Sequence, residues 1–393
     1  MMRETETNLL AITHTYRTFQ KDPLESIAPY FSNVYVCIRS NPAMEILKHV
    51  NRNKYYKNSL DYKIDLSNKP ENCHIYPSPT LYVPIESCYK SVGRKHLTAV
   101  TRIIKRNNLR FQLIHAHFTW SAGYVGACLK EEYDTPFVVT AHGYDIYSLP
   151  FRDADWKSRI EHVLNTADAI TTVSNSNREC IERLNVATPV FVIPNGYNEA
   201  IFYPKDSAGC RRSLGLPLDK KIILSVGNFS PIKGHKYLIS AVKEVAKHQN
   251  DILCIIIGSG QTFQSLERQI KSEQLEQYVR LVDRKPHGEL SLWMNACDIF
   301  VLPSVRESFG LVQIEAMACG KPVVATRNGG SEEIIVSQDC GLLVEPKNSH
   351  ELAEQINTAL NKKWEFQKIL EYSHAFSLEE IAKGYMKVYE KIL

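Results

Sequence analysis

Long hydrophobic runs are missing from this sequence. The longest apolar stretches, such as Ile252–Ile257 and Ile299–Leu302, are far shorter than the roughly 20 apolar residues of a membrane-spanning helix. The N-terminal segment has two acidic residues before a brief apolar run and no small-residue cleavage site, so no signal peptide is expected. We therefore expect a cytoplasmic protein.

Paired cysteines and a strong charge excess are also missing. The ten cysteines are scattered singly at spacings that do not suit zinc, so we expect reduced thiols and no metal. The net charge is only +4, whereas proteins that bind nucleic acid usually carry a marked basic excess, so no nucleic-acid partner is expected. No strand is followed by GxGxxG and an acidic residue about 20 positions later, which disfavours a Rossmann oxidoreductase.

Short apolar runs instead alternate with amphipathic segments of helical length. Most runs are apolar throughout, as strands are when helices cover both faces of a parallel sheet. The expected strands are Asn8–Thr13, Val34–Ile38, Leu113–His117, Phe137–Ala141, Ala169–Val173, Val190–Pro194, Ile222–Val226, Ile252–Gly258, Val279–Val282, Ile299–Leu302, Pro322–Ala325 and Gly341–Val344. The order predicts an α/β protein with doubly wound parallel sheets.

The length of 393 residues favours two domains, and Phe202–Lys220 is a polar stretch with prolines and glycines that separates two sets of strands. We expect an N-terminal Rossmann-like domain over residues 1–203 and a second one over 204–374, facing each other across a central cleft. Residues 375–393 should form a final helix that packs back on the first domain.

Residues 42–110 fit this pattern poorly. They contain thirteen lysines and arginines, five acidic residues and interleaved tyrosines. One interpretation is a solvated insertion with long loops. The other is a surface that contacts anionic lipid headgroups or an anionic acceptor, which would place the protein peripherally on a membrane.

Two loops in the second half suit a phosphorylated ligand. The strand Ile222–Val226 leads into Gly227-Asn228 and ends at Lys233 before a helix, so backbone N–H groups and one cation could approach phosphate. The strand Val279–Val282 ends near Arg284, a polar position suited to a base or ribose.

The strongest signal follows the strand Ile299–Leu302. Gly310 and Leu311 open a helix, whose first N–H groups are unsatisfied and attract anions. Glu315 lies about one turn into this helix, and Glu307 stands in the loop before it. Two carboxylates around a phosphate site suit a ligand that has hydroxyl groups at both ends and phosphate in the middle, as a sugar nucleotide has.

This stretch, PSVRESFGLVQIEAMACGKPVVAT with the following GGSEEII and GLLVEP, resembles the donor domain of retaining family 4 glycosyltransferases with the GT-B fold. The resemblance extends through SVGNFSPIKGHKYLI and IIIGSG, and in the first half through LIHAHFTWSAGYVGACL, FVVTAHGYDIY, TTVSNS and VIPNGYNEAIFYP. It covers roughly residues 113–393, whereas residues 1–112 match only in the general order of strands and helices.

The resemblance implies a hexosyltransferase-type enzyme that moves a sugar from a UDP- or GDP-linked donor to an acceptor hydroxyl with retention, in polysaccharide, glycolipid or glycoconjugate synthesis. It implies no metal or other cofactor. The implied roles are donor-sugar binding by Glu307, diphosphate binding by the N–H groups of Phe309, Gly310 and Leu311 with Lys233, ribose binding by Glu315, a base pocket at Arg284, and an active-site histidine at His142.

Two positions depart from the family pattern. Asn228 stands where the family commonly has an arginine, and the loop Thr13–Thr18 lacks the usual glycines. His14 and Arg17 in that loop are instead candidates for side-chain contacts with the acceptor. Asp153 and Asp155 match an Asp-x-Asp metal motif, but they precede a helix-like segment, and we interpret them as helix-start carboxylates.

Other GT-B functions stay open. A phosphorylase or an epimerase would share the architecture, and so would a non-catalytic protein that binds a sugar nucleotide. The sequence does not identify the nucleotide, the sugar, the acceptor or the linkage.

Overall fold

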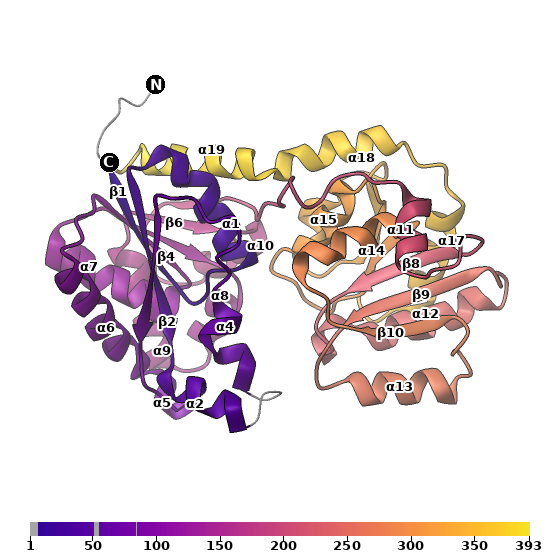
Figure 1. Ribbon diagram of the computed structural model, residues 1–393, viewed down its shortest axis with the longest axis horizontal. Coiled ribbons are helices and arrows are strands. Elements are labelled where there is room, and N and C mark those ends of the chain that lie inside the picture. The colour runs from indigo at the N-terminus through magenta and orange to yellow at the C-terminus, as the bar shows by residue number, and fades with distance from the viewer. Residues whose placement is uncertain (1–6, 51–54, 84) are drawn as a thin grey trace. The chain divides into compact units, whose positions relative to one another are not determined.

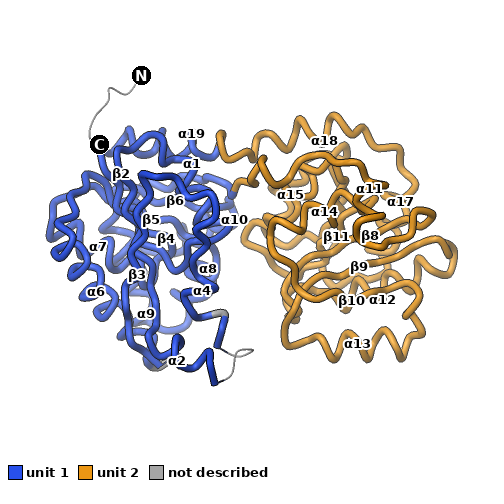
Figure 2. Tube along the Cα trace, viewed as in Figure 1, with its two compact units in different colours: residues 1–195, 381–393 blue, residues 196–380 orange. Residues whose placement is uncertain are grey.

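The computed structural model describes residues 7–50, 55–83 and 85–393. It divides into two compact units, residues 1–195 with 381–393 and residues 196–380 (Figure 2). The first division therefore falls after Asn195 rather than after residue 203, and the last thirteen residues belong with the first unit. Each unit is a parallel sheet covered by helices (Figure 1).

Unit 1 contains a seven-stranded sheet of order β3-β2-β1-β4-β5-β6-β7, in which all neighbours are parallel. Its strands are β1 (Asn8–Thr13), β2 (Asn33–Ser40), β3 (Cys73–Pro79), β4 (Leu113–His117), β5 (Phe137–Ala141), β6 (Ala169–Thr172) and β7 (Val190–Val192). Its helices are α1 (Thr18–Ile27), α2 (Pro42–Val50), α4 (Leu60–Lys63), α5 (Glu86–Tyr89), α6 (Val92–Asn107), α7 (Tyr124–Tyr133), α8 (Tyr144–Tyr147), α9 (Ala154–Thr166), α10 (Asn175–Glu182) and most of α19 (Leu378–Tyr389).

Alternate residues of β1 enter different cores, as the two-residue period of a strand requires. Leu10 and Ile12 pack with α6, α7, α9 and α10 on one face. Leu9 and Ala11 pack with α1 and α19 on the other, where Tyr389 is fully buried. The sheet is thus doubly wound, and the end of the chain completes one of its two cores.

Unit 2 contains a six-stranded parallel sheet of order β10-β9-β8-β11-β12-β13. Its strands are β8 (Lys221–Val226), β9 (Ile252–Gly258), β10 (Val279–Asp283), β11 (Ile299–Leu302), β12 (Val323–Thr326) and β13 (Gly341–Val344). Its helices are α11 (Ser207–Ser213), α12 (His235–Ala246), α13 (Phe263–Ser272), α14 (Leu290–Ala296), α15 (Leu311–Ala318), α16 (Ser331–Ile334), α17 (Ser349–Asn361) and α18 (Phe366–Ser373). The predicted doubly wound α/β fold is confirmed in both units.

The expectation of an insertion with long loops at residues 42–110 is wrong. This stretch supplies α2, β3 and α6, and β3 pairs with β2 along its whole length. The strand was not predicted because Pro77 and Pro79 argue against a strand inside a sheet. Proline is tolerated in an edge strand, and β3 lies at the edge of this sheet. Contact with anionic lipid stays a prediction. Within the described residues, no helix is both long and apolar enough to cross a membrane.

Candidate active site

The strand order of unit 2 reverses between β8 and β11, which are neighbours although three helices and two strands separate them in sequence. Ligands of open α/β sheets bind at such a switch point, beyond the carboxyl ends of the strands. The loops that follow β8 and β11 meet here. Gly234, in the first loop, has φ +66°, and a Cβ atom on it would lie 1.9 Å from the carbonyl oxygen of Pro303 in the second. Only glycine therefore lets the two loops approach this closely.

Two predicted donor residues from these loops contact each other. The Lys233 ammonium lies 2.5 Å from Oε1 of Glu307, and the hydroxyl of Ser304 donates to the same oxygen at 2.7 Å. The backbone N–H of Glu307 donates to the carbonyl of Asn328 at 2.9 Å, which fixes the loop. The pair is partly exposed, with 24% of the lysine and 11% of the glutamate side chain accessible, so a ligand can reach it.

The helix that follows Glu307, α15, begins as the sequence predicts. Gly310 precedes it with φ +92°, and within the described chain no side chain caps this end. The first N–H groups thus remain available to an anion. Gly330 packs against this turn, and a Cβ on it would lie 2.7 Å from backbone atoms of Phe309.

Glu315 is buried in α15, with 1% of its surface exposed. Its Oε1 lies 2.6 Å from Nε2 of His287, which stands just after β10 and packs on the ring of Phe202. Its Oε2 is buried and finds no hydrogen-bond partner among the described residues. Glu315 therefore has one oxygen fixed and one free to accept. His287 was missed by the sequence reasoning, because nothing in its neighbourhood relates it to a glutamate 28 positions later.

The remaining predicted donor residues lie at the same edge of the sheet. Gly227 follows β8 directly, Asn228 is exposed, and Arg284 is exposed after β10. A Cβ on Gly258, at the end of β9, would lie 2.0 Å from the carbonyl oxygen of Gly227, so these two strand ends also touch through backbone.

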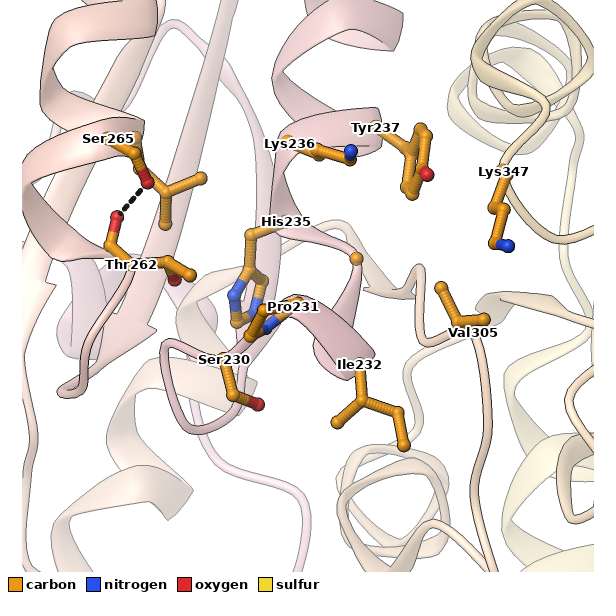
Figure 3. A pocket seen from close by; sticks show the side chains of 12 residues that line it. Ser230, Pro231, Ile232, His235, Lys236, Tyr237, Thr262, Ser265, Val305 and Lys347 are labelled. Carbon is orange, nitrogen blue, oxygen red and sulfur yellow. Dashed lines mark hydrogen bonds between the residues drawn. The ribbon is translucent and has the colours of Figure 1, made fainter.

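A pocket of about 470 Å³ lies beside the loop after β8 (Figure 3). Its lining residues include His235, Lys236 and Tyr237 at the start of α12, and Lys347. In the part of the chain that the structure describes, none of the residues predicted to bind the donor lines it. The pocket adjoins this loop, since Ile232 and Gly234 on either side of Lys233 line it, but Lys233 and Glu307 are not among its lining residues.

The strand order of unit 1 reverses between β1 and β4. His142 follows the adjacent β5, and its Nε2 lies 3.0 Å from Nδ1 of His117 at the end of β4. Burial, with a smaller contribution from His117, holds the pKa of His142 well below its usual value, and burial lowers the pKa of His117 to about 3. Both rings are therefore neutral near pH 7, with one nitrogen donating and the other accepting. Within the described residues, Nδ1 of His142 and Nε2 of His117 have no partner.

The backbone around His142 is held by a carboxylate. Oδ1 of Asp145 accepts from the N–H groups of His142 at 3.1 Å and Gly143 at 2.9 Å, and Oδ2 accepts from Thr119 at 2.8 Å. Asp145 thereby joins the loops after β4 and β5. Its role was not predicted, although it stands three residues after the candidate histidine.

His14 and Arg17 differ in their surroundings. The His14 ring stacks on Phe118 with centroids 4.8 Å apart, and its buried Nε2 finds no partner in the described structure. Arg17 donates to the carbonyl of Tyr62 at 2.7 Å and lies over the ring of that tyrosine. His14 thus faces the switch point, whereas Arg17 joins the loop to α4.

The Asp-x-Asp sequence proves to be a helix start. Asp153 is the N-cap of α9, and its Oδ1 accepts from the N–H of Trp156 at 2.8 Å. Lys90 neutralises both Asp153 and Asp155. The interpretation as helix-start carboxylates is confirmed.

Comparisons with known proteins agree with this architecture. The family model "Glycosyltransferase Family 4" matches residues 65–200, and "Glycosyl transferases group 1" matches residues 208–375. An uncharacterized glycosyltransferase of Methanocaldococcus jannaschii is 33% identical over 285 residues, which are 71% of this chain and 75% of the relative. A D-inositol 3-phosphate glycosyltransferase of Corynebacterium jeikeium is 32% identical over 336 residues, 79% of this chain and 80% of the relative.

Solved structures with the same fold cover nearly the whole chain. Sucrose-phosphate synthase from Thermosynechococcus elongatus superposes with a TM-score of 0.78 at 23% identity over 98% of both chains. HepE of Anabaena in complex with UDP gives a TM-score of 0.74 at 21% identity, over 98% of this chain and 100% of that one. The two family models and the curated relatives fix the assignment: this chain is a member of the family 4 glycosyltransferases, with the GT-B fold.

Proposed function

We propose that the protein transfers a hexosyl group from a nucleoside-diphosphate sugar to an acceptor hydroxyl with retention at the anomeric carbon. The observation that carries the proposal is the Lys233–Glu307 pair at the switch point of unit 2, followed after three residues by the uncapped start of α15. A cation, a carboxylate and a row of free N–H groups are the partners that a sugar diphosphate needs.

In this proposal the diphosphate binds the N–H groups of Phe309, Gly310 and Leu311 and takes the ammonium of Lys233 from Glu307. The carboxylate of Glu307, released from part of its pairing, then accepts hydrogen bonds from hydroxyl groups of the donor sugar. The exchange should cost little free energy, because the Lys233 ammonium leaves one anion, Glu307, for another, the diphosphate, within the same site.

At the other end of the donor, the free Oε2 of Glu315 accepts from the ribose. His287 holds the opposite oxygen and so fixes the carboxylate in one orientation. The backbone of Gly227 and Asn228 lies close to the phosphates in this proposal, and Arg284 contributes to the base pocket. Asn228 supplies no charge, so Lys233 and the N-terminus of α15 alone balance the negative charge of the diphosphate.

We propose a front-face reaction in which the leaving phosphate accepts the proton of the acceptor hydroxyl. The bond from the anomeric carbon to the diphosphate breaks, the bond to the acceptor oxygen forms on the same face, and negative charge grows on the diphosphate. Lys233 and the N–H groups of α15 stabilise that charge without reorganisation, which is the most effective form of electrostatic catalysis.

His142 serves transfer rather than nucleotide binding in this proposal, since it belongs to unit 1 and the nucleotide residues belong to unit 2. Its neutral ring can accept or donate one hydrogen bond through the free Nδ1, while His117 holds the other nitrogen.

UDP is the first nucleotide to test, because HepE is solved with UDP and with UDP-glucose. Thermal shifts with UDP-, GDP- and ADP-sugars would identify the donor, since a ligand that binds only the folded state raises its melting temperature. Proton NMR of the product then reports the anomeric configuration, and inversion would contradict the mechanism.

Glu307→Ala and Lys233→Ala should each abolish transfer and leave the melting temperature of the free protein nearly unchanged. Lys236→Ala is the matched control, because this exposed lysine stands three residues along the same segment. Full activity in either site variant would overturn the assignment. Free epimerised sugar nucleotide, or a requirement for inorganic phosphate as co-substrate, would instead identify an epimerase or a phosphorylase.

A further inference from the structure

Two cations are buried at the carboxyl end of β2 in unit 1. Arg39 is 7% exposed and Lys63, at the end of α4, is 6% exposed. Across residues 7–50, 55–83 and 85–393, neither forms an ion pair with a carboxylate. Burial of an ion costs several kcal/mol unless an opposite charge compensates, so this pair of like charges lacks the partner that a folded protein normally supplies.

The contacts that these side chains do make are neutral. The Lys63 ammonium donates to the carbonyl oxygen of Arg39 at 3.0 Å, and Nη1 of Arg39 donates to the hydroxyl of Ser121 at 2.9 Å. The guanidinium lies over the rings of Tyr82 and Tyr89. Its Nε is buried and has no hydrogen-bond partner in the described structure. One strong donor is thus left unused in a site that is already rich in positive charge.

Histidines complete the surroundings. Both ring nitrogens of His96 in α6 are occupied, Nδ1 at 3.0 Å from the hydroxyl of Ser121 and Nε2 at 3.3 Å from that of Ser78. The ring of His14 differs, because its buried Nε2 has no partner in the described structure. Burial is the main cause that holds the pKa of His96 well below its usual value, and the positive charges of Arg39 and Lys63 lower it further. The carboxylate that acts on Lys63, Glu45 in α2, is already bound to Lys48 at 2.8 Å.

The group lies at the carboxyl edge of the parallel sheet, where β2 neighbours β1 and the strand order reverses one strand further on. Doubly wound sheets bind their ligands at this edge. We propose that Arg39 and Lys63, with His14 beside them, bind the phosphate monoester of a phosphorylated polyol or sugar acceptor. The assignment rests on the proposed transfer reaction, since it names the acceptor of that reaction.

A phosphate monoester suits the site better than a carboxylate does. It carries a charge of about −1.5 to −2 near pH 7, which suits Arg39 together with a protonated Lys63, whereas Arg39 alone would balance a carboxylate. Its several oxygens offer acceptors to Lys63 and to Nε of Arg39 and Nε2 of His14, two buried nitrogens that find no partner in the described structure. Charge-assisted hydrogen bonds of this kind are roughly twice as strong as neutral ones.

Proton uptake should accompany binding. Burial, and then the charge of Arg39, lowers the pKa of Lys63 to about 7. Most of this lysine is therefore neutral at pH 7.5, and a dianion beside it would restore the proton. The groups that face Lys63 are Arg39 on β2, Glu45 on α2, His14 after β1 and His96 on α6, and among them only Glu45 opposes the positive charge.

The experiment is isothermal titration of the full-length protein with glycerol 3-phosphate, inorganic phosphate and glycerol. Saturating UDP is present so that phosphate cannot occupy the donor site. Glycerol 3-phosphate should bind at least as tightly as inorganic phosphate, and glycerol should not bind. Heats measured at pH 7.5 in two buffers of different ionisation enthalpy should show proton uptake.

Arg39→Gln and Lys63→Met should each weaken binding of glycerol 3-phosphate at least tenfold, and Lys63→Met should abolish proton uptake. Lys63→Arg keeps the charge and should stay within about threefold of the wild type. Lys69→Met is the matched control: this half-buried lysine also donates to backbone carbonyls, at 2.7 Å to Cys73, but at the amino end of β3. It should bind as the wild type does.

The outcomes separate the two proposals. Wild-type protein that binds UDP but not glycerol 3-phosphate overturns the phosphate site and leaves the proposed transferase intact. Failure to bind any nucleoside diphosphate overturns the donor assignment, and the Arg39 and Lys63 variants then still show whether glycerol 3-phosphate binds at these two residues. Equal weakening by Lys69→Met, or inorganic phosphate at least tenfold tighter than the ester, also overturns the acceptor assignment. If Arg39→Gln fails to fold, Lys63→Met and the proton uptake decide.

Discussion

Gly234→Ala tests whether the approach of two loops creates the donor site. The substitution adds one methyl group to a residue with φ +66°, and this carbon would lie 1.9 Å from the Pro303 carbonyl oxygen. Two costs follow. The left-handed backbone costs an alanine about 1–2 kcal/mol, and the overlap forces the loops after β8 and β11 apart by roughly 1 Å, since non-bonded carbon and oxygen do not approach within about 3 Å.

Gly215→Ala separates these two costs. Gly215 also lies in unit 2 and has φ +62°, but a Cβ on it would meet no described atom within 4 Å. It should suffer only the backbone strain. For a unit of this size, 1 kcal/mol corresponds to about 2–4 °C, so we expect Gly215→Ala to lower the melting temperature by roughly 2–8 °C. Gly234→Ala should lower it further.

The functional difference should be larger than the difference in stability. Lys233 directly precedes Gly234, so the displacement separates its ammonium from Glu307 and from the phosphates. A misplacement of about 1 Å costs on the order of 100-fold in rate. We therefore expect Gly234→Ala to lose about 100-fold in transfer rate and Gly215→Ala to keep it within threefold, as measured well below both melting temperatures.

Equal destabilisation of the two variants would show that the Pro303 contact adds nothing. Normal transfer by a folded Gly234→Ala protein would refute the reasoning itself, because the close approach of the loops would then be irrelevant to the donor.

Four other predictions concern single side chains. Lys233→Met should weaken UDP binding by about 10- to 100-fold, as expected for a lost hydrogen bond between charged groups; unchanged affinity in a titration would place the phosphates elsewhere. His142→Ala should lower the transfer rate more than the UDP affinity, and loss of UDP binding would instead put this histidine in the donor pocket. His287→Phe leaves Glu315 buried without its partner. It should weaken UDP binding without changing which nucleotide binds most tightly, and an unchanged dissociation constant for UDP would exclude Glu315 from the ribose site. Burial holds the pKa of His115 well below that of the unfolded chain, so its contribution to stability is present above about pH 6.5 and lost as the pH falls below it. Between pH 6.5 and 5.5 the unfolding free energy of His115→Gln should therefore fall by about 1 kcal/mol less than that of the wild type. The same pH dependence for both proteins in urea denaturation would contradict this.

The strand ends of unit 2 could be predicted from the sequence because they are marked by glycine. Gly234 and Gly310 punctuate strand–loop–helix junctions that local pattern alone defines. The sequence also indicated that Lys233 and Glu307 serve the same ligand. It did not reveal that they bind each other, because an ion pair between residues 74 positions apart depends on the strand order and not on spacing.

The edge strand β3 could not be predicted, since its prolines and polar residues resemble a loop and only its pairing with β2 makes it a strand. The same limit applies to His287, whose place beside Glu315 follows from the adjacency of loops. Local sequence propensity predicts neither the pairing of β3 with β2 nor the contact of His287 with Glu315.

The two switch points explain why the donor class is easier to infer than the acceptor. In the proposed donor site of unit 2 the backbone itself approaches the ligand, and the glycines that this requires are visible in the sequence. In unit 1 the corresponding loop after β1 has none, and in the proposed acceptor site recognition falls to side chains: His14 after β1, Arg39 at the end of β2, and Lys63 from a four-residue helix. Each of these side chains is unremarkable in its own neighbourhood. Only the fold brings Arg39 and Lys63 together, and within the described residues neither of these two buried side chains has a carboxylate partner.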